Sequence, residues 1–297
     1  MSDYRLGIDI GGTKIEIVAL DAEGQVVLRH RVSNPGTYQG LLSDVKKLVD
    51  DAHSRTNPYA TVGVGIPGAV DAHTRLVKNA NATWLNGQPF ADDLQDVLGF
   101  PVRVENDANC FALSEATDGA AAGRHVVFGV ILGSGMGGGI IVDGKPLKGL
   151  HDIAGEWGHI PLPWVREDEF PMPKCFCGNS GCLERFLCGP ALAEAWQGPG
   201  NRSVQGIEDA AAAGDIAAQR ALDLYVDRLG RACALIVNII DPDAIVLGGG
   251  VSNLSCLYER VPDAMKRYVI TPECKTELLK NRHGDSSGVR GAAWLWG

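Results

Sequence analysis

The first part of the chain alternates short apolar runs with glycine-rich turns. The runs at residues 6–10, 15–20 and 25–32 predict three strands joined by tight turns. Residues 40–55 repeat their apolar side chains at helical spacing, so we expect one helix there. Residues 62–66 predict a short buried strand that ends in a Pro-Gly turn. The pattern is typical of an α/β protein.

A similar pattern starts again about 120 residues later. Residues 126–132 predict a strand, 133–139 a glycine turn, 140–142 a second strand, and 143–144 a hairpin turn. A strand, a glycine hairpin and a second strand thus occur twice, which indicates an internal duplication. Two α/β units of this kind are expected to face each other across a cleft, where ligands commonly bind.

The remaining segments are mostly helical by pattern. Residues 206–240 are rich in alanine and leucine at helical spacing and predict one long helix. Residues 244–247 predict a buried strand, and Val102–Val104 predict another. Residues 288–297 predict a terminal helix that is too apolar to stay solvated.

Composition narrows the class of protein. The chain has 297 residues, a net charge of −9 and a pI near 5.3, which weighs against binding nucleic acid or an anionic membrane. Neither a secretory leader nor a membrane span is expected from the sequence, so we predict a cytoplasmic protein. Eight cysteines in such a protein favour metal binding over disulfides.

Three of these cysteines form a closely spaced cluster with a histidine upstream. Cys175, Cys177 and Cys182 follow a C-x-C-x4-C pattern, and with His159 they complete a tetrahedral zinc set. A catalytic zinc site keeps one position open, whereas these four ligands fill all of them, so a structural zinc is favoured over a hydrolase centre. Two carboxylates, Glu156 and Glu184, flank the ligands, and the metal would fix them in space.

Three glycine turns at strand ends suit the binding of phosphate or a nucleoside. The first is Asp9–Lys14, where Gly11 and Gly12 expose backbone N–H groups, and Asp9 could hold Mg²⁺. The second is Gly133–Gly139, and the third is Gly248–Gly250, whose bare backbone suits a flat ring such as adenine. Each alone is explained equally by an ordinary turn, but three in a duplicated fold favour a ligand site.

Asp107 lies where a strand meets a helix. One explanation is that it caps the helix, a role that Asp performs well. The other is that it acts as a general base during phosphoryl transfer. The adjacent Asn106 favours contact with a ligand, because two polar side chains then stand together at the strand's end.

Taken together, these segments resemble the ROK family of bacterial sugar kinases, within the actin-like ATPase superfamily. The matching segments span almost the whole chain: Asp9–Lys14, Gly65–Gly68, Glu105–Asn109, Gly133–Gly139, Glu156–His159, Cys175–Glu184 and Leu247–Gly250. The resemblance implies the actin-like ATPase (ribonuclease H-like) fold, with two α/β domains around a central cleft. It predicts domains at 1–118 and 119–284, with a helix at about 285–297 that returns to the first domain.

The resemblance also implies an activity and the residues that carry it. It implies an ATP- and Mg²⁺-dependent hexose kinase with a structural Zn²⁺, in which Asp107 is the catalytic base on the primary hydroxyl of the sugar. The sugar-binding residues would be Gly68, Asn81, Asn106, Asp107, Glu156, His159 and Glu184. The ATP-binding residues would be Asp9, Gly11, Gly12, Thr13, Lys14, Gly133, Ser134, Gly135, Gly137, Gly248 and Gly249.

Within the family, residues 78–90, 155–164 and 283–296 resemble the fructokinase branch, so fructose is the expected substrate. An N-acetylglucosamine kinase and a broad gluco/mannokinase are the alternatives. A sugar-responsive regulator and an actin-like filament protein are alternatives from other classes. The resemblance also implies a homodimer.

Overall fold

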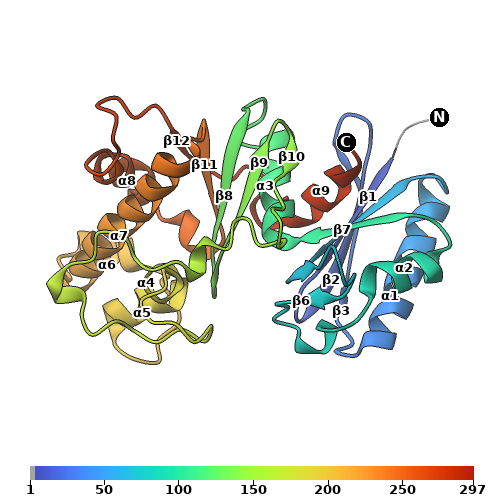
Figure 1. The fold of residues 1–297 in the computed structure, drawn as a ribbon, viewed down its shortest axis with the longest axis horizontal. Helices are drawn as coiled ribbons and strands as arrows, with labels where there is room; N and C mark the ends of the chain where they lie inside the picture. The colour runs from blue at the N-terminus through green and yellow to red at the C-terminus, as the bar shows by residue number, and fades with distance from the viewer. Residues whose placement is uncertain (1–3) are drawn as a thin grey trace. The chain divides into compact units, whose positions relative to one another are not determined.

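The computed structural model describes residues 4–297, which form two compact units. The first unit holds the described residues up to 122 together with 144–154 and 285–297. The second holds 123–143 and 155–284. Each unit is built on its own sheet flanked by helices (Figure 1). The chain therefore passes from one unit to the other more than once.

The sheet of the first unit has the order β3-β2-β1-β4-β7. Its strands are β1 (Arg5–Ile10), β2 (Lys14–Leu20), β3 (Val26–Ser33), β4 (Thr61–Ile66) and β7 (Val102–Asn106). Strands β1 to β3 are antiparallel neighbours, while β4 runs parallel to both β1 and β7. The predicted strands are confirmed, each within about one residue at its start.

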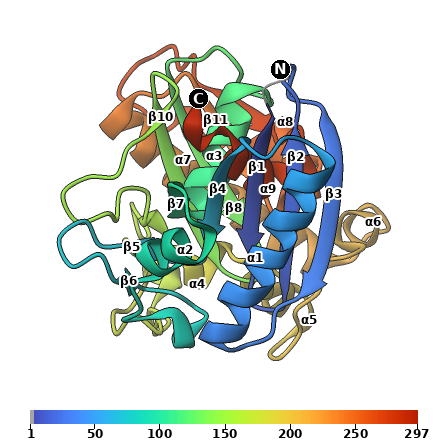
Figure 2. The same cartoon turned by 90° about the vertical axis from the view of Figure 1, so that its right-hand side faces the viewer.

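Helices cover both faces of this sheet. The amphipathic helix α1 (Tyr38–Arg55) and the shorter α2 (Phe90–Leu98) pack on one face, where they share an apolar core with β1, β2 and β4 (Figure 2). Helix α3 (Asp107–Thr117) and the C-terminal α9 (Ser287–Ala293) contact each other, and α9 also contacts β1 and β4. The predicted helices at 40–55 and at the C-terminus are confirmed.

The second unit repeats this strand order. Strands β8 (Val126–Leu132), β9 (Met136–Val142), β11 (Ala244–Gly248) and β12 (Glu277–Lys280) follow the order β9-β8-β11-β12. As in β2-β1-β4-β7, the first pair is antiparallel and the next two pairs are parallel. The two sheets therefore share the arrangement that a duplication predicts.

Helices α4 to α8 belong to the second unit, and several of them enclose its apolar core. They are α4 (Glu184–Leu187), α5 (Gly189–Gln197), α6 (Ile207–Ala212), α7 (Ile216–Ile240) and α8 (Cys256–Lys266). The short elements of the described chain are β5 (Ala69–Val70), β6 (Val77–Lys78), β10 (Lys145–Pro146) and the single-turn helices η1 (Thr83–Leu85), η2 (Trp157–His159), η3 (Glu167–Glu169), η4 (Gly250–Asn253), η5 (Gly284–Ser286) and η6 (Trp294–Trp296).

Two expectations about the second unit were wrong in part. The glycine turn at 133–139 ends at Gly135, because β9 begins at Met136 and runs through Gly137–Gly139. A Cβ on Gly138 would lie 2.9 Å from the Trp157 ring, so Gly138 serves close packing on a strand. The helix expected over 206–240 is broken after Ala212, where Gly214 has a φ of +94° and Asp215 caps α7.

None of the helices formed by residues 4–297 is both long and apolar enough to cross a membrane.

Candidate active site and metal centre

The junction of β7 and α3 holds Asn106 and Asp107. The Asn106 side chain caps α3, because its Oδ1 accepts from the backbone N–H groups of Ala108 at 2.9 Å and Asn109 at 3.2 Å. Its Nδ2 donates to the carbonyl oxygen of Gly68 at 3.1 Å. The capping explanation for Asp107 was therefore wrong: Asp107 is the first residue of the helix itself.

A pocket of about 460 Å³ in the first unit has Asp107 in its wall. Its other lining residues are Gly11, Gly12, Pro67, Asn81, Ala82, Thr83 and Trp84. The pocket thus joins the predicted base and Asn81 to the two glycines of the first phosphate turn. Pro67, Thr83 and Trp84 were not predicted as site residues, although they lie in two segments, Gly65–Gly68 and 78–90, that resemble the ROK family.

Asp9 lies on β1 next to charged residues of the neighbouring strands. It pairs in register with Glu16 on β2, and Glu16 is buried and accepts hydrogen bonds from Arg29 and Arg31 at 2.6 Å each. Burial, and then the Glu16 carboxylate, raise the pKa of Asp9 to about 6, against the opposing charges of Lys14 and Arg31. Because a cation would relieve this unfavourable negative charge, the donor set fits Mg²⁺.

Four ligand atoms in the second unit converge on one point. The ligand atoms of His159, Cys175, Cys177 and Cys182 all lie within 4.8 Å of one another. His159 Nδ1 is 3.6 Å from Cys175 Sγ, and Cys177 Sγ is 3.6 Å from Cys182 Sγ. Thiolates on a tetrahedral zinc with Zn–S bonds of about 2.3 Å are about 3.8 Å apart, so the cluster fits zinc.

The loop that carries Cys175, Cys177 and Cys182 is closed by hydrogen bonds within its own backbone. Cys175 N donates to Asn179 O at 2.8 Å, and Gly178 N donates to Cys175 O at 3.1 Å. Gly178 and Gly181 have φ of +95° and +79°, which permits the tight turns that bring the thiols together. Because the Nδ1 atom of His159 faces the thiols, its other ring nitrogen remains available for a different partner.

Glu156 and Glu184 are anchored to the same strand by different contacts. Glu184 begins α4, and its Oε2 accepts from Met136 N, the first residue of β9, at 3.1 Å. Glu156 directly precedes Trp157, whose indole donates to Gly137 O, also on β9, at 3.1 Å. The exposed Glu156 side chain makes no hydrogen bond or ion pair with any of residues 4–297. Strand β9 therefore holds the Glu184 carboxylate directly and fixes the residue that follows Glu156.

The two glycine turns of the second unit are neighbours. Gly248 ends β11, and a Cβ on the following Gly249 would lie 2.5 Å from Leu132 O at the end of β8. Gly133 lies next to Leu132, and its carbonyl accepts from Gly189 N at 2.8 Å. The predicted nucleotide-binding residues thus fall into two groups: Asp9–Lys14 in the first unit, and Gly133–Gly137 with Gly248 and Gly249 in the second.

A buried ion-pair network holds the segment between His159 and the cysteines. Arg231 of α7 is fully buried and donates to Pro163 O and Trp164 O at 3.1 and 2.8 Å, and to the Glu169 carboxylate at 2.9 and 2.5 Å. Burial opposes the charge on Glu169, but hydrogen bonds from Arg231, the Arg166 backbone and Arg228 outweigh it and lower its pKa to about 2. Sequence analysis gave no sign of this network.

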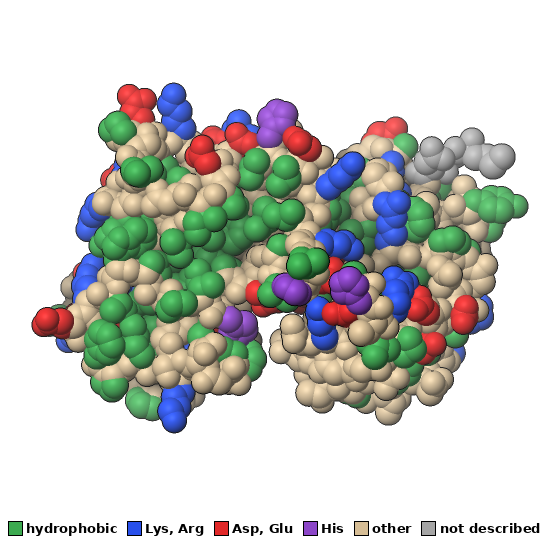
Figure 3. All heavy atoms as spheres, viewed as in Figure 1, with side chains coloured by type: hydrophobic (Ala, Val, Ile, Leu, Met, Phe, Trp, Pro, Cys, Tyr) green, Lys and Arg blue, Asp and Glu red, His purple; other side chains and the backbone are tan. Residues whose placement is uncertain are grey.

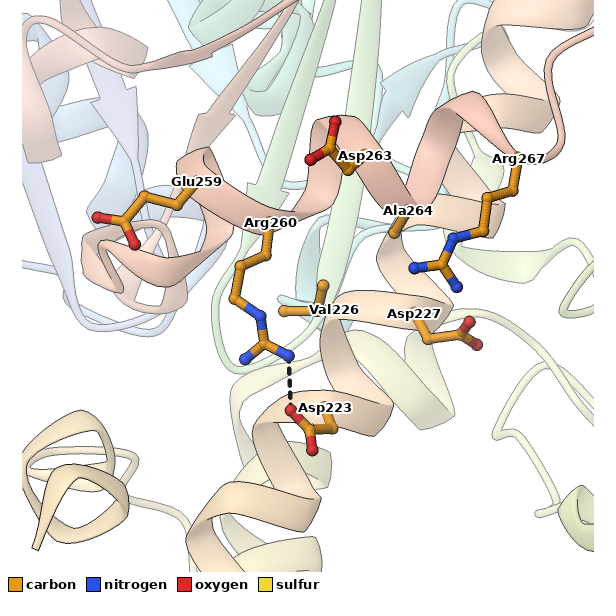
Figure 4. Close-up of a pocket in the computed structure, with 8 residues that line it drawn as sticks. All are labelled: Asp223, Val226, Asp227, Glu259, Arg260, Asp263, Ala264 and Arg267. Carbon is orange, nitrogen blue, oxygen red and sulfur yellow. Dashed lines mark hydrogen bonds and ion pairs between the residues drawn. The ribbon is translucent and has the colours of Figure 1, made fainter.

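A second pocket lies between α7 and α8 in the second unit (Figure 4). It measures about 390 Å³ and is lined mostly by charged side chains, of which Arg260 pairs with Asp223 at 2.5 Å. Apolar side chains gather on the visible face of this unit (Figure 3), and Ile239 and Ile270 are 66% and 93% exposed. None of the predicted site residues lines this pocket.

The family model for the ROK family matches residues 5–297. The chain belongs to the ROK family. Among its relatives, N-acetyl-D-glucosamine kinase of Escherichia fergusonii is 39% identical over 296 residues, covering 97% of this chain and 98% of the relative. The Salmonella typhimurium protein of the same name is 38% identical over the same share of each chain.

Solved structures of ROK proteins have the same fold. A ROK hexokinase from Thermus thermophilus superimposes with a TM-score of 0.84 at 29% identity, covering 98% of this chain and 97% of that one. A ROK glucokinase from Streptomyces griseus, solved with glucose and AMPPNP, gives 0.76 at 29% identity, with 98% of each chain covered. The resemblance to ROK sugar kinases and the actin-like ATPase fold are confirmed.

The chain is therefore an ATP-dependent sugar kinase of the ROK family. The narrower expectation of a fructokinase finds no support in these comparisons. The two enzymes of 39% and 38% identity match over nearly the full length and are N-acetylglucosamine kinases, which was the alternative.

Proposed function

We propose that this ROK protein transfers the γ-phosphoryl group of ATP to the primary hydroxyl of N-acetylglucosamine. The observation that carries the proposal is the pocket in which Asp107 lies with Gly11 and Gly12 of the phosphate turn. A kinase needs a group that accepts the hydroxyl proton close to groups that hold phosphate. The choice of sugar follows the relatives of 39% and 38% identity.

Asp107 is the proposed catalytic base. Phosphoryl transfer depends mainly on positioning and charge stabilisation, so the base orients the hydroxyl and accepts its proton as the new bond forms. Asn106 supports this role, because it donates to Gly68 O and accepts from Ala108 N at the start of α3. These contacts fix the backbone next to the Asp107 carboxylate. Gly68, Asn81, Asn106, Glu156, His159 and Glu184 are the proposed sugar-binding residues.

The phosphate groups are proposed to bind the glycine turns of both units. In the first turn Gly11 N donates to Lys14 O at 2.9 Å, which leaves Gly12 and Thr13 at the exposed tip with the Lys14 ammonium beside them. Mg²⁺ held near Asp9 would neutralise charge on the transferring phosphates. Gly133, Ser134, Gly135, Gly137, Gly248 and Gly249 are the proposed nucleotide contacts of the second unit.

The proposed zinc is structural. All four of its positions are taken by protein ligands, so it has no place for substrate. Its expected effect is to hold His159 and the loop that leads into Glu184 in one arrangement. That a homodimer forms stays a prediction, which a mass measurement by light scattering would check.

A coupled assay of ADP release with N-acetylglucosamine, glucose, mannose and fructose tests the proposal. N-acetylglucosamine should give the highest kcat/KM, and product analysis should place the phosphate on the primary hydroxyl. A higher kcat/KM with fructose would restore the fructokinase alternative. Absence of sugar-dependent ADP release with all four sugars would favour a sugar-responsive regulator.

A further inference from the structure

The loop at residues 77–88 lines part of the pocket that holds Asp107, and hydrogen bonds within the loop fix its backbone. Asn86 clamps it: its Oδ1 accepts from Ala80 N at 2.8 Å, and its Nδ2 donates to Ala80 O at 3.0 Å. The base of the loop is closed by Val77 N to Gln88 O at 2.9 Å and by Gly87 N to Val77 O at 2.8 Å. The backbone of the loop is thus determined without any ligand.

Two buried side chains fix the tip of this loop to the core. Ala82 and Leu85 are 8% and 0% exposed, and both belong to the core cluster shared with β1, β2 and α1. Trp84 lies between them in sequence, is half-buried, and packs against the same cluster. The position of its indole ring is therefore set by the protein.

The polar side chains with which this loop lines the pocket have no hydrogen-bond partner among the described residues. Asn81, Thr83 and Trp84 all line the pocket, and their side chains make no hydrogen bond with any residue in the range 4–297. The indole N–H of Trp84 is also absent from the buried polar atoms that lack a partner, so it is open to solvent.

The other tryptophans show how unusual this is. Of the six, Trp157, Trp196, Trp294 and Trp296 each donate their indole N–H to an acceptor in the described chain. Trp164, like Trp84, donates to none of the described residues, but it lies at the surface of the second unit, 45% exposed, against Tyr268. Only Trp84 combines a free indole N–H with a place in the wall of the pocket that holds Asp107.

The chemistry of an indole selects one kind of sugar substituent. The indole has a single donor, no acceptor and a broad apolar face. An acetamido group has a carbonyl oxygen, which accepts hydrogen bonds and cannot donate them, and a methyl group, which prefers apolar contact. The hydroxyl of glucose at the same carbon is shorter than the acetamido group and carries no methyl group, so it gains less from an indole placed to meet the acetamido carbonyl.

We propose that Trp84 is the specificity-determining residue for a 2-acetamido sugar: its indole N–H donates to the acetamido carbonyl and its ring covers the acetamido methyl. The inference rests on the proposed function, because it assigns a residue to the substituent that separates N-acetylglucosamine from glucose. It adds a role for a side chain that sequence analysis did not select.

The test compares kcat/KM for N-acetylglucosamine and for glucose in the wild-type protein and in Trp84→Phe. The phenylalanine keeps an aromatic face and removes the donor. The ratio of the two kcat/KM values should fall about 5- to 10-fold, as expected for one lost hydrogen bond to N-acetylglucosamine. Trp164→Phe is the matched control, and it should leave the ratio unchanged.

The outcomes separate the two proposals. If the wild-type protein prefers glucose or fructose, the proposed function fails and the role of Trp84 fails with it. If the wild-type protein prefers N-acetylglucosamine but Trp84→Phe keeps the same ratio, or loses both sugars equally, only the role of Trp84 is overturned. Should the variant fail to fold, the wild-type protein is titrated by calorimetry with N-acetylglucosamine and with its thioacetamido analogue. The weaker sulfur acceptor should lower affinity several-fold, and equal affinity would overturn the inference.

Discussion

Asn106 and Asp107 are adjacent in sequence, but the fold gives them different contacts. Asn106 uses its carbonyl oxygen to cap α3 and its amide to hold Gly68. This leaves the carboxylate of Asp107 in the pocket wall at the first position of the helix.

Replacing Asp107 with Asn should lower kcat by roughly 10²–10⁴-fold, because the amide keeps the shape but cannot accept the proton. The cap on α3 belongs to Asn106, so the melting temperature should stay close to that of the wild-type protein. Steady-state kinetics and thermal unfolding of the same preparation check both points. Turnover near the wild-type rate would remove Asp107 from the catalytic role.

Asp9→Asn should stabilise the metal-free protein at neutral pH while it weakens the kinase. The folded-state pKa of about 6 lies above the ordinary 3.8, so the folded state binds the extra proton and stability falls as pH rises from about 4 to 6. Above that window the carboxylate costs up to about 3 kcal/mol, and less in practice because Asp9 is only partly buried.

Denaturant unfolding in EDTA at several pH values checks this. The advantage of Asp9→Asn should be largest above pH 6 and should shrink toward pH 4. An advantage that stays constant across this range would show that the charge of Asp9 is not its cause.

At the scale of elements, the single-turn helix η3 is held to α7 by buried charge. Arg231 and Glu169 meet where both are almost completely buried, and Arg231 also binds two carbonyls of the segment that leads from His159 toward the cysteines. Because the zinc ligands lie on both sides of this segment, its position affects the whole metal site.

Arg231→Met should lower the free energy of unfolding by about 3–5 kcal/mol, since Glu169 would lose its main partner while it stays buried. The variant should also lose zinc to a chelator faster than the wild-type protein does. Arg260→Met is the matched control, because its pair with Asp223 is exposed and should contribute less than about 1 kcal/mol. Equal stability and equal zinc retention in the two variants would contradict the role given to the network.

Removing zinc should raise KM for the sugar more than it lowers kcat. The metal does no chemistry in this proposal, but its loop leads into Glu184 and its ligand His159 is a proposed sugar contact. Metal analysis of protein purified without added zinc, followed by chelation and kinetics, measures the effect. Full sugar affinity after complete zinc loss would show that the cluster and the sugar site are independent.

At the scale of the whole chain, segments from its beginning, middle and end build one unit. The last helix, α9, fits against β1, β4 and α3 through glycines. A Cβ on Gly291 would lie 1.6 Å from Cys110 O on α3, and one on Gly63 would lie 1.9 Å from Ala292 O. No side chain fits at either contact, so the docking of α9 depends on glycine at these positions.

Gly291→Ala should therefore destabilise the protein by several kcal/mol or prevent folding, as overpacking of a rigid backbone contact does. Gly288→Ala on the same helix is the control. Its Cβ would meet only Asp9 Oδ1 at 3.8 Å, so stability should be unchanged or up to about 1 kcal/mol higher. Thermal unfolding of both variants tests this, and similar melting temperatures would contradict the close packing of α9.

Much of this architecture follows from local pattern. The strands near residues 6–10, 15–20 and 126–132, the helix α1 and the grouping of His159 with the three cysteines were all predicted correctly from spacing alone. Alternation, helical periodicity and metal-ligand spacing act over a few residues, where the backbone itself determines which side chains share a face. The break after Ala212 was missed although its signals, Gly214 and the capping Asp215, are local. The strand conformation of residues 137–139 was missed because it depends on pairing with β8.

The sequence by itself determined the repeated strand pattern, the grouping of His159 with the three cysteines and, by resemblance, the family. Only the tertiary structure decided that Asn106 rather than Asp107 caps α3, that Arg231 holds Glu169, and that Trp84 lies in the wall of one pocket with Asp107. The physical reason is the range of the interactions. Spacing along the chain fixes which groups can share one strand or loop, whereas the meeting of distant side chains depends on how whole elements pack.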